Sequence, residues 1–169
     1  MRALLICCWT GLLATSLLLS ACATNTGASS DYTLYLMRHA EKVADNSKDP
    51  DLTDAGKTRA DNIAERLQDK GIRDVWSSDY QRTRETAAPL AKELGLKVKI
   101  YDPKDQSKLI TQLKKRHQNA LIVGHSNTIP ELADMLCNCD VAEMEEAEYN
   151  RLIVIHMLNG KAELQTLSQ

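Results

Sequence analysis

Leu36-Met37-Arg38-His39-Ala40-Glu41-Lys42 is the stretch in which an apolar run that begins at Tyr32 stops at an arginine, a histidine and an acid. The run from Tyr32 to Met37 has the length and composition of a buried strand. An arginine fork matches the planar oxygens of phosphate or carboxylate, and a neutral imidazole beside it can act as a nucleophile or proton carrier. Taken alone, Arg38 and His39 favour an ordinary strand end with a solvated arginine, so the interpretation depends on partners elsewhere in the chain.

The rest of the sequence alternates short apolar runs with segments of helical period, which is typical of a mostly parallel sheet flanked by helices. We predict an α/β fold, namely a three-layer α/β/α sandwich with a mostly parallel central sheet and an antiparallel strand at the edge. Further strands are expected at 72–76, 97–101, 120–123, 151–158 and 161–167, the last two joined by Asn159-Gly160. Helices are expected from Thr53 to Gly71, from Gln81 to Leu94, from Asp105 or Ser107 to Arg116, and around Ile129 to Leu136. Pro89 predicts a kink or a later start in the second helix.

Residues 1–21 differ in kind from the remainder. Met1-Arg2 is a short positive start, an almost entirely apolar segment follows, and Leu19-Ser20-Ala21-Cys22 closes it. This organisation is typical of a secretion signal, and the last four residues resemble the bacterial lipobox, which implies cleavage before Cys22 and lipid attachment to its thiol. An uncleaved membrane anchor is the alternative.

The predicted domain organisation is a signal peptide at 1–21, a flexible tether at 22–30 and one globular domain at 31–169. The tether is small, polar and contains glycine. The domain would be exported and lipid-anchored in the bacterial cell envelope on the periplasmic face, at the outer membrane in a Gram-negative cell.

Two cysteines remain in the globular domain, Cys137 and Cys139. They are poorly spaced for an unstrained disulfide with each other and are too few for a metal site. We therefore expect two thiols in a loop without catalytic importance, and a redox or metal-binding lipoprotein is the less favoured alternative. The acidic segment 137–150 is expected to be solvated surface.

The chain carries 21 Lys and Arg against 23 Asp and Glu, a net charge of -2. This balance argues against a nucleic-acid-binding protein, which would carry a basic excess.

Three of the predicted strands end in residues that a phosphate site needs. Arg38-His39 follows the first strand, Ser77-Ser78 leads to Arg82 after the second, and Gly124-His125 follows the strand at 120–123. Ligands of open parallel sheets lie outside the carboxyl ends of the strands, so these segments are expected to converge. The helices that follow point their N-termini at the same edge, which favours an anion.

With these segments the chain resembles the histidine phosphatase (phosphoglycerate mutase-like) superfamily across Tyr32 to Leu167. The matching segments are Leu-Met-Arg-His-Ala-Glu-Lys at 36–42, Asp-Leu-Thr-Asp-Ala-Gly at 51–56, Ser-Ser-Asp-Tyr-Gln-Arg-Thr-Arg-Glu-Thr-Ala at 77–87 and Val-Gly-His-Ser-Asn-Thr at 123–128. The small size and the Arg-His-Ala form most resemble the compact branch that includes the protein phosphohistidine phosphatases.

The resemblance implies that His39 attacks phosphorus and carries the phosphoryl group transiently. It implies that Arg38 and Arg82 clamp the equatorial oxygens, that His125 donates to the same oxygens, and that no metal or cofactor is required. Ser126 and Asn127 would line the pocket or cap the next helix. Arg84 is interpreted as a surface or accessory residue, and His117 and His156 as residues with local roles.

The general acid that protonates a leaving alkoxide is the least defined part, because the segment that carries a glutamate in larger family members is nearly missing. Asp102, directly after a strand, is the first choice, with Asp105 and Glu41 as alternatives and a turn-forming role for Asp102 as the structural alternative. Without an acid in reach, good leaving groups such as a phosphohistidine imidazole would be favoured.

The expected function is a metal-independent phosphatase that hydrolyses a phosphomonoester or phosphoramidate through a phosphohistidine on His39. Its partners would be a phosphorylated small molecule, phosphosugar or phosphoprotein and, through Cys22, the membrane, with no nucleic acid and a monomeric state. A catalytically weak, phosphate-recognising lipoprotein of the same fold is the alternative, and a mutase is disfavoured because it calls for a larger lid and a defined acid.

Overall fold

The computed structural model describes residues 31–169, so the predicted signal peptide, the tether and Cys22 lie outside the described residues. A six-stranded sheet runs through the middle of the domain in the order β3-β2-β4-β1-β5-β6. The elements are β1 (Tyr32–Arg38), α1 (Asp54–Leu67), β2 (Asp74–Ser78), α2 (Gln81–Glu93), β3 (Val98–Tyr101), α3 (Gln106–Arg116), β4 (Ala120–Gly124), α4 (Thr128–Cys137), β5 (Arg151–Leu158) and β6 (Lys161–Ser168).

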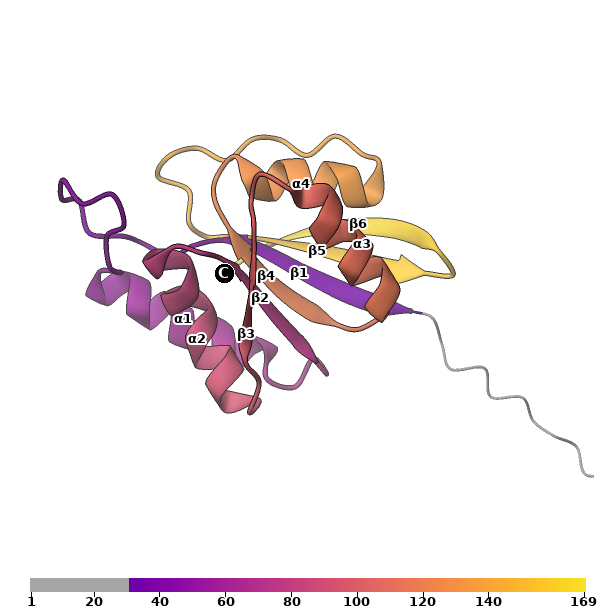
Figure 1. The fold of residues 1–169 in the computed structure, drawn as a ribbon, viewed down its shortest axis with the longest axis horizontal. Coiled ribbons are helices and arrows are strands. Elements are labelled where there is room, and N and C mark those ends of the chain that lie inside the picture. The colour runs from indigo at the N-terminus through magenta and orange to yellow at the C-terminus, as the bar shows by residue number, and fades with distance from the viewer. Residues whose placement is uncertain (1–30) are drawn as a thin grey trace, which may run out of the picture.

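The four strands β3, β2, β4 and β1 are parallel, while β5 and β6 continue the sheet in antiparallel fashion. Helices α1 and α2 cover one face and α3 and α4 cover the other, as Figure 1 shows. This arrangement confirms the predicted three-layer α/β/α sandwich with an antiparallel strand at the edge.

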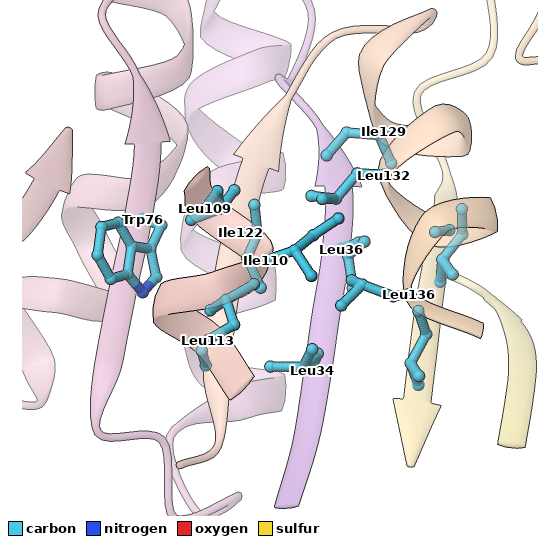
Figure 2. Close-up of a cluster of buried hydrophobic side chains, with 14 of the residues drawn as sticks. Leu34, Leu36, Trp76, Leu109, Ile110, Leu113, Ile122, Ile129, Leu132 and Leu136 are labelled. Carbon is cyan, nitrogen blue, oxygen red and sulfur yellow. The ribbon is translucent and has the colours of Figure 1, made fainter. Parts of the chain in front are cut away.

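Strand β1 is buried on both faces, which explains its continuous apolar sequence. Leu34 and Leu36 point into the cluster under α3 and α4 (Figure 2), whereas Tyr35 and Met37 belong to the cluster under α1 and α2. Trp76 packs in the first cluster and is 6% exposed. A strand placed centrally in this way holds its last residue, Arg38, at a fixed position relative to both helical layers.

Most of the predicted elements are present, with two shifts of interest. β2 lies two residues further along the chain than predicted and includes Ser77 and Ser78, both fully buried. Burial of these serines is tolerated because Ser77 Oγ donates to the Ser78 carbonyl and Ser78 Oγ donates to Thr83 Oγ1. The later start predicted for α2 is wrong, since the helix runs from Gln81 through Pro89 to Glu93.

The expectation of two separate thiols at Cys137 and Cys139 is also wrong, because the structure joins them in a disulfide. Helix α4 ends at Cys137, and Asn138 adopts the left-handed conformation with φ 52°. This turn brings the two Cα atoms to 5.2 Å, which lies within the range of ordinary disulfides.

The predicted hairpin is confirmed at Asn159 and Gly160, which have φ values of 50° and 79°. Positive φ at both central residues is what a two-residue turn of this kind needs, and it places β6 at the edge of the sheet.

No helix among residues 31–169 has the length and apolar character that crossing a bilayer would require.

Candidate active site

Three strand ends meet at one edge of the sheet, as the sequence predicted. Arg38 pairs with Gly124 across β1 and β4, and the backbone N–H of His39 donates to the Gly124 carbonyl at 2.9 Å. This register sets His125 beside His39, with the ring centroids 5.7 Å apart. β2 flanks β4 on its other side and brings Ser78 and the start of α2 to the same place.

His39 is almost completely buried, at 3% exposure. Its Nδ1 lies 2.7 Å from the carbonyl oxygen of Ala40. A carbonyl can only accept, so Nδ1 carries the proton in the neutral ring and Nε2 keeps the lone pair. The local backbone thus fixes the tautomer in which Nε2 is the nucleophilic atom.

Arg38 is oriented by backbone carbonyls of the loop between α4 and β5. Its Nη1 donates to the carbonyl of Glu146 at 2.7 Å, with those of Glu145 and Glu148 at 3.1 and 3.3 Å. Its guanidinium carbon lies 4.3 Å from the centroid of the Tyr149 ring, a cation–π arrangement. The side chain is 3% exposed, and its Nε has no hydrogen-bond partner in the described residues.

The loop that supplies these carbonyls is held by Arg151. The Arg151 guanidinium donates to the Ala142 and Glu143 carbonyls and to both carboxylate oxygens of Glu148. The hydrogen bonds from Arg151 hold the pKa of the Glu148 carboxyl below its usual range. The prediction of a solvated acidic segment is therefore only partly right, because its side chains include buried Val141 and Met144 and its backbone builds the site.

Arg82 is the second guanidinium of the site and comes from the first turn of α2. Its Nη1 lies 3.5 Å from the Asp49 carboxylate, and its guanidinium carbon lies 4.5 Å from the Tyr80 ring centroid. Asp49 also accepts from the backbone N–H of Gln81 at 2.7 Å, which supplies the cap that Tyr80 does not give this helix. The Nε of Arg82 is likewise buried without a partner in the described residues.

His125 completes the group from the end of β4. Its Nε2 lies 2.9 Å from Ser78 Oγ, and its ring contacts Tyr80 edge-on at 4.9 Å between centroids. Thr83 Oγ1 donates to backbone carbonyls and accepts from Ser78 Oγ at 3.0 Å. A chain of hydroxyls therefore anchors one nitrogen of the imidazole.

These residues surround a pocket of about 380 Å³. Its lining consists of Arg38, His39, Lys42, Tyr80, Arg82, Pro103, Lys104, His125, Ser126, Asn127, Thr128 and Glu146. A larger hollow of about 760 Å³ lies between α1 and α2, but four carboxylates line it and make it unsuitable for an anion. The sequence therefore identified the residues at the base of the pocket, but not Tyr80, Tyr149 or Glu146, for which no local signal exists.

The suggestion that Asp102 is the general acid is not supported by its position. Its carboxylate accepts from the backbone N–H of Lys104 at 2.9 Å, so it forms the turn that was the alternative interpretation, and it does not line the pocket. Asp105 caps α3 through the N–H of Lys108, and Glu41 accepts from Nε and Nη2 of Arg59. Within the described chain the pocket lining contains one carboxylate, that of Glu146, 3.4 Å from Arg38 Nη2.

The other singled-out residues lie away from the base of the pocket or beside it. Arg84 pairs with Asp79, and His156 shares a hydrogen bond with Thr33 Oγ1 at 3.0 Å. His117 ends α3 and packs edge-on against Tyr32. Ser126 and Asn127 line the pocket, and Asn127 does not cap α4 with its side chain.

Both histidines of the site are held neutral near physiological pH. Burial lowers the pKa of His39 to about 3; the hydrogen bond to Ala40 opposes this shift, and the positive charges of Arg38 and Arg82 add to it. Burial and the same two arginines lower the pKa of His125 to about 4. An unprotonated His39 is the form that can attack phosphorus.

These shifts predict a fall in stability on acidification. In the unfolded chain both imidazoles bind protons below about pH 6.5, whereas in the folded chain they stay neutral down to about 4 and about 3. The unfolded state then binds more protons, so the free energy of unfolding falls by about 1.4 kcal/mol per pH unit for each histidine between these values. Urea unfolding at pH 7 and pH 5 measures this slope, and a His39→Gln, His125→Gln double variant should flatten it. An equal slope in the two proteins would contradict the expectation.

The described residues contain no group of three or more His, Cys, Asp or Glu side chains placed to hold a metal ion. The positive charge of the pocket comes instead from guanidinium and ammonium groups.

Comparison with known proteins agrees with this geometry. Residues 34–103 match the model of the histidine phosphatase superfamily (branch 1). The chain is 30% identical over 121 residues to a probable phosphoglycerate mutase, GpmB, of Escherichia coli O139:H28, a match that covers 68% of this chain and 56% of that protein. The chain thus spans little more than half the length of the curated relatives it matches.

Two solved structures illustrate the shared fold. The protein histidine phosphatase SixA, complexed with tungstate, has a TM-score of 0.67 at 18% identity over 80% of this chain and 96% of that chain. A mycobacterial glucosyl-3-phosphoglycerate phosphatase has a TM-score of 0.63 at 16% identity over 82% of this chain and 98% of that chain.

Proposed function

Because the chain belongs to the histidine phosphatase superfamily, we propose that it is a phosphatase that hydrolyses its substrate through a phosphohistidine formed on Nε2 of His39. Both phosphatases and a probable mutase are among its relatives, and the pocket favours the former. A mutase must hand the phosphoryl group to a second alcohol, which calls for a positioned acid and base that this pocket does not bring together.

The observation that carries the proposal is that one pocket brings together His39, whose tautomer is fixed, and the guanidiniums of Arg38 and Arg82. The Arg38 side chain is 3% exposed and the Arg82 side chain is 14% exposed, so both charges lie in a largely desolvated site where they act strongly on an anion. A phosphoryl group in this pocket would accept charge-assisted hydrogen bonds from the guanidinium groups of the two lining arginines.

The chemistry follows from these positions. The lone pair of His39 Nε2 attacks phosphorus while the bond to the leaving group breaks, and the leaving group departs with the electron pair. The guanidiniums of Arg38 and Arg82 stabilise the charge on the equatorial oxygens, and His125 would add to them when a bound dianion favours protonation of its second ring nitrogen. Water then attacks phosphorus, the P–N bond breaks with its electrons returning to Nε2, and the proton of water goes to the released phosphate.

The position of Asp102 bears on the leaving group. Among the described residues the one carboxylate of the lining, that of Glu146, lies against Arg38, so substrates that need little protonation are favoured, such as aryl phosphates, enol phosphates and phosphoramidates. A phosphohistidine substrate fits this condition, and the structurally similar SixA is a protein histidine phosphatase. The weak definition of a general acid also favours the second candidate, which is a phosphate-binding domain with very slow turnover.

Trapping the intermediate separates the two candidates. The protein is mixed with a radiolabelled aryl phosphate, quenched within milliseconds and denatured. We expect label that is stable to alkali and lost in acid, as a phosphohistidine is, and no label on a His39→Gln protein. Turnover of the aryl phosphate without such label would refute the phosphohistidine route, and binding of inorganic phosphate without turnover or label would favour the binding domain.

For the site of action we propose the bacterial envelope, with the domain tethered through a lipid on Cys22. The support for the tether is in the sequence, namely Leu19-Ser20-Ala21-Cys22 after an apolar segment. The Cys137–Cys139 disulfide is consistent with an oxidising compartment. Labelling cells with a clickable fatty acid tests the tether, and a Cys22→Ala protein should remain unlabelled.

A further inference from the structure

We propose that the edge of the sheet opposite the pocket is a docking surface for a lipid bilayer with anionic head groups. The surface surrounds the start of β1, and its contact with lipid does not depend on the phosphatase activity. We call it the basic edge, after its exposed cations Lys70, Arg73, Lys114, Lys115 and Lys161.

Contacts between loops make the basic edge one continuous surface. The side chain of Asn119, just before β4, accepts from the backbone N–H of Thr33 in β1 and donates to the carbonyl of Lys70, both at 2.8 Å. The backbone N–H of Arg73 donates to the Asn119 carbonyl at 2.9 Å. The segments that lead into β1, β2 and β4 are therefore side by side.

A hollow of about 590 Å³ lies in this surface, at the end of α4. Tyr32, Leu136 and Met157 give it apolar side chains, and Lys114 and Lys161 give it ammonium groups. Figure 1 shows that α3 ends close to the start of β1 and to the turn between β5 and β6. The described residues that line the hollow include no carboxylate, so the hollow suits an amphiphilic anion.

The cations of the basic edge have no internal partner. Over residues 31–169 no hydrogen bond or ion pair is made by the side chains of Lys70, Arg73, Lys114, Lys115 and Lys161. The loops that lead into β1 and β2 add two carboxylates, those of Asp31 and Asp69, so positive charge stays in excess. The dipole of α3 explains two lysines in its last turn, but not Lys161, which begins β6. The excess is local, because the whole chain has a net charge of -2.

The place where the chain enters the domain favours a bilayer as the partner. Cys22 precedes Tyr32 by ten residues, which span at most about 35 Å when fully extended. A lipid on Cys22, as proposed above, would hold the start of β1 near the membrane. Met135, which also lines the hollow, is 42% exposed and is suited to the apolar side of the head-group region. Anionic head groups attract the surrounding cations.

Docking at the basic edge sets the direction in which the pocket opens. Strand β1 begins at Tyr32 on this edge and ends at Arg38 in the pocket. A strand of this length separates its two ends by about 20 Å. The pocket would therefore face away from the bilayer and receive its substrate from solution.

Lysine acetylation by acetic anhydride, followed by peptide mass spectrometry, tests the contact in the full chain. The chain is reconstituted in vesicles of phosphatidylcholine alone or mixed equally with phosphatidylglycerol. We expect the anionic vesicles to slow acetylation of Lys114 and Lys161 about fivefold, and high salt to remove this protection. Lys42 and Lys104, which line the pocket at the other edge, should react equally on both vesicles.

The lipid state of Cys22 is the same in both kinds of vesicle, so the comparison reports on the surface and not on the tether. Equal acetylation of Lys114 and Lys161 on the two vesicles would overturn the docking surface. Equal protection of these lysines by glycerol phosphate without vesicles would also refute a bilayer, because a soluble anion would then be enough.

Two charge-matched triple variants locate the contact, and acetylation of Lys70 is the readout. Protection of Lys70 on anionic vesicles should be lost when the edge is neutralised by Lys114→Gln, Lys115→Gln and Lys161→Gln. It should persist when the same number of exposed lysines is removed elsewhere, by Lys48→Gln, Lys104→Gln and Lys108→Gln. Equal loss in the two variants would show a general effect of net charge and would contradict a localised surface.

Discussion

A His39→Ala protein should lose activity toward an aryl phosphate by about a thousandfold or more in kcat, because the atom that accepts the phosphoryl group is gone. Arg38, Arg82 and His125 remain and still bind phosphate, so the KM should change far less than kcat. The expected result is thus a protein that binds inorganic phosphate but does not turn over, measured by steady-state kinetics and by calorimetry.

The matched control is His156→Ala. His156 is a histidine of β5 whose ring bonds to Thr33, and its replacement leaves the pocket intact. Its kcat should stay near that of the unaltered protein. Full activity in the His39→Ala protein would refute the nucleophilic role of this residue, whereas equal loss in both variants would indicate a folding defect.

A Gly56→Ala substitution should destabilise the domain by about 3 kcal/mol. On helix propensity alone this change would stabilise α1 by about 1 kcal/mol. However, a Cβ at this position would lie 2.2 Å from the backbone carbonyl oxygen of Glu41. That oxygen accepts from the backbone N–H of Thr53 at 2.9 Å and cannot move without breaking the junction between the first loop and α1.

Urea unfolding at pH 7 measures the change in the free energy of unfolding. The sign of this change decides between the steric clash and the gain in helix propensity. Gly95→Ala is a useful comparison, because a Cβ there meets no atom within 4 Å and the cost arises only from its φ of +64°. We expect a smaller loss for Gly95→Ala, of about 1 kcal/mol. A neutral or stabilising Gly56→Ala would contradict the close approach. Because Glu41 lies two residues after His39, a fall in kcat should accompany the fall in stability.

The site was predictable from the sequence to the extent that its residues end strands. Arg38-His39 and Gly124-His125 follow buried apolar runs, and adjacent parallel strands carry their ends to one edge. Their burial and neutral state could not be read from the sequence. The burial and the neutral state of these histidines depend on how α2 and the loop before β5 pack over the site. The low exposure of His39 and the lowered pKa values of His39 and His125 result from this packing.

The errors share a cause. Asp102 was interpreted from its place directly after a strand, and Cys137 and Cys139 from their spacing. A carboxylate at a strand end can face the pocket or form a turn, and two cysteines one residue apart can meet or stay apart. The decision lies in backbone angles that are set by the surrounding packing, such as the left-handed Asn138.

The sequence by itself determined the sandwich, the antiparallel strand at its edge and the four residues at the base of the pocket, because periodicity and strand-end chemistry are local properties. Only the tertiary structure decided what surrounds them. Arg38 is held by carbonyls about 107 residues away, and Lys42 and Lys104 line one pocket from two separate loops. Contacts at such separation follow from register and loop packing, for which no local pattern in the chain exists.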